Sequence, residues 1–133
     1  MRILYVDDEP DIRTVAVMSL QLHPGFEVAE CPSGALALQM AHDWQPDVVL
    51  LDVMMPEMDG AMTRAALRDD PATTAIPVVF VTARTQPAEL ERLRALGVTG
   101  IIAKPFDPMV LASQVTAIMG WPDPGDDATT GRV

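Results

Sequence analysis

Short apolar runs alternate along the chain with longer segments in which apolar residues recur at helical spacing. The apolar runs are rich in Val, Ile and Leu, as strands are. In chain order, the strand-like segments are residues 2–6, 26–30, 47–51, 76–83 and 99–104. The helix-like segments are residues 10–22, 33–44, a segment around 58–66, 87–97 and 107–120. Strict alternation of strand and helix predicts an α/β fold with a doubly wound parallel sheet and helices on both faces.

Apolar spacing also predicts the side of each helix that faces the core, and local residues predict where helices begin. We expect the inward faces of the second and third helices to consist of Leu36, Ala37, Met40 and Ala41, and of Met58, Ala61, Met62, Ala65 and Ala66. Asp107 is expected to be the N-cap of the fifth helix, with Pro108 at its first position. The segment 26–30 alternates apolar and polar residues and is expected at the sheet edge, whereas 47–51 is continuously apolar and is expected to be covered on both faces.

Length, net charge and cysteine content limit the kinds of protein that this chain can be. The 133 residues suffice for one domain, 1–119, and the Pro-, Gly- and Asp-rich segment 120–133 is expected to be a disordered acidic tail. The net charge of −10 opposes both nucleic acid and anionic lipid, so we expect no nucleic-acid partner and no membrane insertion. A single cysteine, Cys31, and no signal-peptide pattern favour the cytoplasm.

Polar residues end most of the predicted strands. Asp7 and Asp8 follow the first strand, Asp52 the third, Thr82 the fourth and Lys104 the fifth. In open parallel sheets the ligand site lies at the carboxyl ends of the strands, near the point where strand order reverses. Three carboxylates, a hydroxyl and an ammonium group are therefore expected to share one rim of the sheet.

The acids after the first strand allow two interpretations. Acids near a helix N-terminus cap backbone N–H groups and complement the helix dipole. Adjacent carboxylates such as Asp7 and Asp8 repel each other, which instead favours a cation bound between them. On this segment alone the two interpretations stay open.

The shared rim gives each residue type a role in phosphoryl transfer to a carboxylate. Asp8, Asp52, Asp7 through water and the backbone carbonyl of Met54 could hold Mg²⁺ or Mn²⁺. Asp52 could then act as the nucleophile. Lys104 and Thr82 would contact the phosphoryl oxygens as a point charge and a hydrogen-bond donor.

Four motifs in this order resemble one known family, the receiver domains of two-component response regulators. They are VDDEP after the first strand, LLDVMMPEMDG around the third, FVTA on the fourth and AKPF on the fifth, and the resemblance covers residues 2 to about 119. Within this family, the chain most resembles the stand-alone, single-domain type, such as the chemotaxis receiver. It implies a flavodoxin-like (βα)5 fold with strand order 2-1-3-4-5, and a cis Lys104–Pro105 bond.

The resemblance also implies the function and the partners. Asp52 would take a phosphoryl group from a histidine kinase or phosphotransfer protein, Asp7 and Asp8 would serve Mg²⁺, and Thr82 and Lys104 would sense the phosphoryl group. The chain would be a signalling phosphoprotein rather than an enzyme. A downstream protein would bind the face formed by the fourth helix, fifth strand and fifth helix. Ile101 stands where members of the family often carry an aromatic residue, which predicts a weaker conformational switch.

Two other functions remain open. A receiver-like module could bind partners without phosphorylation, although the complete set of five polar residues argues against this. A metal-dependent aspartyl phosphatase uses similar chemistry but typically needs a general acid two residues after the nucleophile, where this chain has Met54.

Overall fold

The computed structural model describes residues 1–122, and the remainder of the predicted tail, residues 123–133, lies outside the described part. Five parallel strands form one sheet in the order β2-β1-β3-β4-β5. The strands are β1 (Arg2–Val6), β2 (Glu27–Cys31), β3 (Val48–Asp52), β4 (Val78–Thr82) and β5 (Gly100–Ala103). The helices are α1 (Pro10–Gln21), α2 (Gly34–Trp44), α3 (Gly60–Asp69), α4 (Pro87–Ala95) and α5 (Leu111–Met119). The predicted doubly wound fold and its strand order are confirmed.

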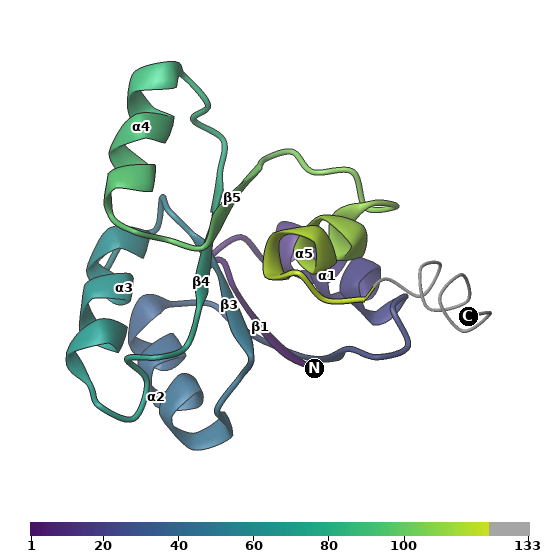
Figure 1. Cartoon of the computed structure of the whole chain (residues 1–133), viewed down its shortest axis with the longest axis horizontal. Coiled ribbons are helices and arrows are strands. Elements are labelled where there is room, and N and C mark those ends of the chain that lie inside the picture. The colour runs from purple at the N-terminus through teal and green to yellow at the C-terminus, as the bar shows by residue number, and fades with distance from the viewer. Residues whose placement is uncertain (123–133) are drawn as a thin grey trace.

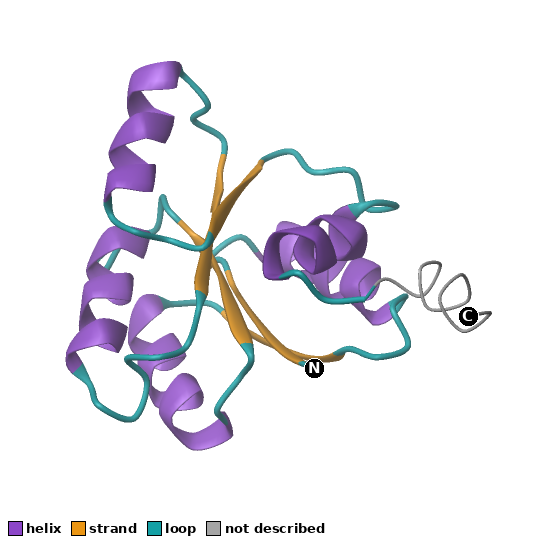
Figure 2. Cartoon of the chain, viewed as in Figure 1, coloured by secondary structure: helices purple, strands orange, loops and turns teal. Residues whose placement is uncertain are grey.

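The helices cover the sheet in two layers. Helices α2, α3 and α4 lie on one face, and α1 and α5 lie on the other (Figure 1). Figure 2, coloured by secondary structure, shows the strands between these layers. Alternate residues of β1 serve the two faces: Leu4 and Val6 belong to the core under α2, α3 and α4, whereas Ile3 and Tyr5 belong to the core under α1 and α5.

Strand burial follows position in the sheet. Every residue of β3 and β4 is buried, as expected for central strands covered on both faces. Strand β2 is buried only at Cys31, in agreement with its predicted edge position. Within residues 1–122, no helix is both long enough and apolar enough to cross a membrane.

The predicted inward faces of α2 and α3 are partly wrong. Leu36 and Met62 are 49 % and 52 % exposed. Ala65 is exposed as well. Ala37 and Ala41 are buried as predicted, together with Gly34 on α2 and with Gly60, Thr63 and Leu67 on α3, which were not predicted. Small residues let the two helices approach each other closely: a Cβ added to Gly34 would lie 2.2 Å from the Thr63 hydroxyl. Close packing therefore outweighed side-chain hydrophobicity in orienting these helices.

The predicted start of the fifth helix is also wrong. Helix α5 begins at Leu111, and Val110 occupies its N-cap position without a capping side chain. The Asp107 carboxylate accepts a hydrogen bond from the Met109 N–H at 2.9 Å, and the Asp107 carbonyl accepts one from the Val110 N–H. Asp107 thus closes a turn before the helix instead of capping it.

Candidate functional site

The three predicted carboxylates meet at the carboxyl end of the sheet. Asp7 and Asp8 follow β1, and Asp52 is the last residue of the adjacent strand β3. One carboxylate oxygen from each residue lies within 4.8 Å of the others. Oxygen ligands at this spacing are suited to a hard divalent cation, so the site could hold Mg²⁺.

Asp7 is fully buried because its carboxylate is surrounded by donors. The Tyr5 hydroxyl donates to Asp7 Oδ2 at 3.0 Å, and the Glu9 N–H donates to Asp7 Oδ1 at 3.0 Å. Glu9 occupies the N-cap position of α1, but its side chain makes no capping hydrogen bond. The Glu9 side chain therefore does not cap α1, whereas Asp7 accepts one backbone N–H just before this helix. The hydrogen bond from Tyr5 was not predicted from the sequence.

Lys104 joins the carboxylates from the end of β5. Its Nζ lies 2.7 Å from Asp7 Oδ2, 3.4 Å from Asp52 Oδ2 and 3.6 Å from Glu9 Oε1. The bond between Lys104 and Pro105 is cis, as the resemblance implied. Burial by itself would lower the pKa of Lys104, but the hydrogen bond to Asp7 and the nearby negative charges together raise it. Lys104 is therefore a permanent cation in this cluster.

The Asp52 carboxyl lies in surroundings that disfavour its ionised form. It is only 3 % exposed, and burial together with the Asp7 charge raises its pKa to about 6. Lys104 and the Met54 N–H, 3.4 Å from Asp52 Oδ1, act in the opposite direction. Asp52 is therefore ionised at neutral pH, but at a cost that an added cation would reduce.

Thr82 lies at the end of β4, one position beyond the residue that pairs with Asp52. Its side chain is fully buried, and its hydroxyl accepts a hydrogen bond from the Arg84 N–H at 3.0 Å. The same hydroxyl can donate to the Arg84 carbonyl at 3.5 Å. Thr82 is thus held by the loop that leads into α4 rather than by the carboxylates.

The loop after Asp52 is fixed by the start of α3. Asp59 caps this helix by accepting from the Met62 N–H, and the Gly60 N–H donates to the Val53 carbonyl at 3.0 Å. A Cβ on Gly60 would lie 2.7 Å from the Asp52 carbonyl oxygen. Glycine is needed here because the helix start touches the backbone of the site.

The comparisons with known proteins identify the family. A sequence profile described as the response regulator receiver domain matches residues 3–116. The chain belongs to this family, whose members are phosphoacceptor signalling modules of two-component systems and bind Mg²⁺ in an acidic pocket.

Individual relatives match the same region of the chain, and a solved structure has the same fold. The chain is 37 % identical over 118 residues to the response regulator PleD of Caulobacter vibrioides, and 32 % identical over 124 residues to the phosphate regulon regulatory protein PhoB of Pseudomonas aeruginosa. These alignments cover 88 % and 93 % of this chain but 26 % and 54 % of the relatives. The solved structure of the chemotaxis response regulator CheY4 of Vibrio cholerae aligns with a TM-score of 0.80 at 32 % identity, covering 88 % of this chain and 97 % of that one.

Proposed function

We propose that Asp52 accepts a phosphoryl group from the phosphohistidine of a histidine kinase or phosphotransfer protein, in a reaction that depends on Mg²⁺. The observation that supports this most directly is the cluster in which buried Asp7 and Asp52 meet the partly buried Asp8, with Lys104 in contact with the first two. An ionised, poorly solvated carboxylate beside fixed positive charge is suited to attack an anionic phosphoryl group.

The transfer needs no further reactant. A carboxylate oxygen of Asp52 forms a bond to phosphorus while the bond from phosphorus to the donor's imidazole nitrogen breaks, and the electron pair stays on that nitrogen. Lys104, already 3.4 Å from Asp52, would pair with an oxygen of the transferred group. Thr82 would have to exchange its hydrogen bonds with Arg84 for one to the phosphoryl group.

The carboxylate cluster fits a magnesium ion. We assign Asp8, Asp52, the Met54 carbonyl and Asp7 through water as its ligands. When bound, the ion supplies positive charge that screens the phosphoryl oxygens from the carboxylates. The raised pKa of Asp52 supports this assignment, because burial and then the Asp7 charge disfavour its ionised form, and a bound cation would offset both effects.

The phosphodonor would approach over an exposed apolar strip on α1. A hollow lined by Lys104, Phe106, Ile12 and Val15 adjoins the carboxylate rim, and Val15 also lines the next hollow, with Met18. Both Val15 and Met18 are exposed to solvent, at 42 % and 63 %. Continuity with the rim supports a donor protein as the occupant of this strip.

We expect a downstream protein to bind the face formed by α4, β5 and α5. The loop held by the Thr82 hydroxyl leads directly into α4, and Ile101 on β5 packs against the core on the α4 side. A rearrangement of Thr82 would therefore change the conformation of this face, and a downstream protein would bind the phosphorylated form more tightly there. With Ile101 at this position we expect a preference of about 1 to 2 kcal/mol.

Labelling with a small phosphodonor tests the proposal. Acetyl phosphate plus Mg²⁺ should add one phosphoryl group, detected by intact-protein mass spectrometry, to the wild type and to the control Asp69→Asn, but not to Asp52→Asn. Absence of labelling with a folded protein would favour a module that acts without phosphorylation. Turnover of added phosphomonoesters would favour a phosphatase.

A further inference from the structure

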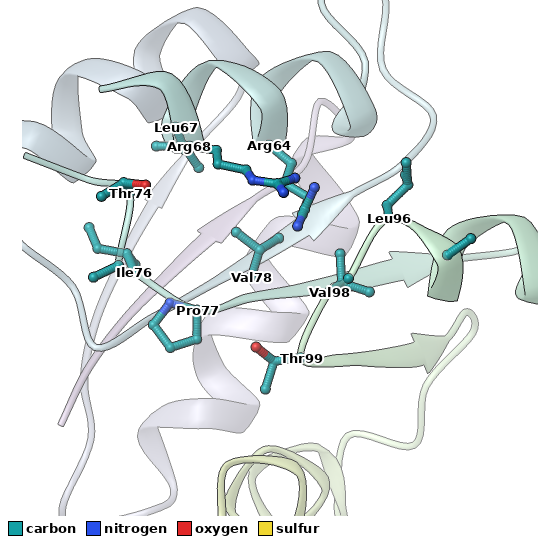
Figure 3. A pocket seen from close by; sticks show the side chains of 13 residues that line it. Arg64, Leu67, Arg68, Thr74, Ile76, Pro77, Val78, Leu96, Val98 and Thr99 are labelled. Atoms are coloured by element: carbon teal, nitrogen blue, oxygen red, sulfur yellow. The ribbon is translucent and has the colours of Figure 1, made fainter. Parts of the chain in front are cut away.

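Another hollow lies far from the carboxylate rim, between α3 and α4 at the amino ends of β4 and β5. Its volume is about 590 Å³, within the usual range of small-molecule sites. Apolar side chains, among them Leu67, Val78 and Leu96, line it together with Arg64 and Arg68. Figure 3 shows both arginine side chains extending from α3 over the same part of the hollow, near Val78.

The charge of this hollow differs from that of the rest of the molecule. The chain has 19 acidic residues and a net charge of −10, yet none of the lining residues is acidic. Arg64 and Arg68 are four residues apart and therefore lie on one face of the helix. Burial and the neighbouring Arg68 charge lower the pKa of Arg64, as expected for two cations that share a partly enclosed space.

The two guanidinium groups have no partner among the described residues. Neither makes a hydrogen bond or an ion pair there. By contrast, Arg13 pairs with Glu30 and Arg92 pairs with Glu89. A purely structural role for Arg64 would be to bind the last carbonyls of α4, because its guanidinium lies near Gly97. No such hydrogen bond forms within residues 1–122, so the donors stay available.

We propose that this hollow binds a small organic anion, with its phosphate or carboxylate group held between Arg64 and Arg68 and its apolar body over Leu67, Val78 and Leu96. Guanidinium groups present planar pairs of donors that match both oxyanions. The negative charge elsewhere on the protein does not prevent this, because physiological salt screens charges beyond about 8 Å. The site is separate from Asp52 and does not depend on its phosphorylation.

Amide chemical-shift titration tests the proposal. The probes are phenyl phosphate, benzoate and inorganic phosphate, added to the full chain without Mg²⁺. We expect shifts centred on Val78, Gly97 and Thr99, which line the hollow. Whichever of the two aromatic anions binds more tightly identifies the oxyanion, and inorganic phosphate should bind more weakly because it lacks an apolar body. If inorganic phosphate bound as tightly as the aromatic anions, the proposed contact of an apolar body with Leu67, Val78 and Leu96 would be wrong.

Charge-matched variants separate this site from general attraction. Arg64→Gln combined with Arg68→Gln should weaken binding at least about tenfold, because each guanidinium supplies charge-assisted hydrogen bonds. Arg68 is exposed, so Arg68→Gln alone should fold normally and still weaken binding at least about threefold. Arg94→Gln, the same charge change at an exposed position on α4, should bind as the wild type does.

Two results would overturn the proposal. One is an absence of shifts around the hollow at about 10 mM of every probe, a concentration that detects even millimolar dissociation constants. The other is that binding disappears in Asp52→Asn, or that shifts centre on Asp7 and Asp52, since the probe would then occupy the carboxylate rim. Unchanged binding to Asp52→Asn is expected.

Discussion

Replacing Asp52 by Asn should stabilise the metal-free protein at neutral pH. The substitution keeps the shape of the side chain and removes one of three clustered negative charges. A pKa raised from 3.8 to about 6 corresponds to a cost of up to about 3 kcal/mol for the ionised form in the folded state. Because Asn mimics the neutral acid, we expect the free energy of unfolding to rise by about 1 to 3 kcal/mol at pH 7.5.

The gain should depend on pH in a defined direction. The folded-state pKa of Asp52 lies above the unfolded value, so between about pH 4 and pH 6 the folded state binds more protons than the unfolded state. The stability of the wild type therefore falls as pH rises through this window and this contribution levels off above it. The advantage of Asn should be complete above about pH 7 and nearly absent at pH 4.

Urea unfolding with a chelator present measures this difference. Wild type, Asp52→Asn and the control Glu91→Gln should be compared at pH 4.5 and pH 7.5. Glu91 is exposed on α4, so its variant reports the general benefit of removing one negative charge. The reasoning fails if Asn gives the same gain at both pH values, or no more than Glu91→Gln gives at pH 7.5.

Three further predictions concern the neighbours of Asp52. Tyr5→Phe should lower the free energy of unfolding by about 1.5 to 3 kcal/mol in urea titrations, because buried Asp7 loses a donor; an unchanged value would contradict the hydrogen bond. Lys104→Met should raise the pKa of Asp52 above about 6, because the Lys104 charge lowers that pKa in the wild type. Carboxyl NMR titrations measure the value, and a lower pKa in the variant would contradict the prediction. Mg²⁺ at ten times its dissociation constant should stabilise the wild type by about 1.4 kcal/mol, measured by thermal unfolding. At that concentration Asp8→Asn should lose more of this effect than Asp7→Asn, and the reverse order would exclude Asp8 as the principal ligand.

The sheet and the site could be predicted from sequence because both depend on order along the chain. Alternation of strands and helices restricts the topology, and the carboxyl ends of parallel strands lie at one edge. The meeting of Asp7, Asp8 and Asp52 follows from that rule without knowledge of any side-chain contact. Distances and hydrogen bonds require the packed structure.

The orientation of α2 and α3 does not follow from the spacing of apolar residues alone. Gly34 and Gly60 carry no apolar side chain, yet both are buried at close contacts, and each helix rotates to accommodate them. Met62 consequently faces solvent. Such close approaches depend on the distance between elements, which the periodicity of one segment does not contain.

Tyr5 is a residue that sequence reasoning missed although a signal was present. Residues two apart on a strand point to the same face, and Asp7, one residue past the end of β1, lies on the same side as Tyr5, whose hydroxyl it accepts from. An apolar run ending in a buried acid should therefore prompt a search for a donor two positions earlier. The buried phenol donates to Asp7, which in turn raises the pKa of Tyr5, after the larger effect of its burial.

The hydrogen bonds around Asp7 indicate which carboxylates would contact a bound cation directly. Asp7 Oδ1 accepts from the Glu9 N–H, and Asp7 Oδ2 accepts from both the Tyr5 hydroxyl and Lys104 Nζ. A carboxylate has about four acceptor positions, so three are already filled. Asp52 Oδ1 has only a long contact of 3.4 Å to the Met54 N–H. Asp52 thus has more acceptor positions left than Asp7 for direct contact with a cation, and we propose that Asp7 acts through water and by holding Lys104 beside the nucleophile.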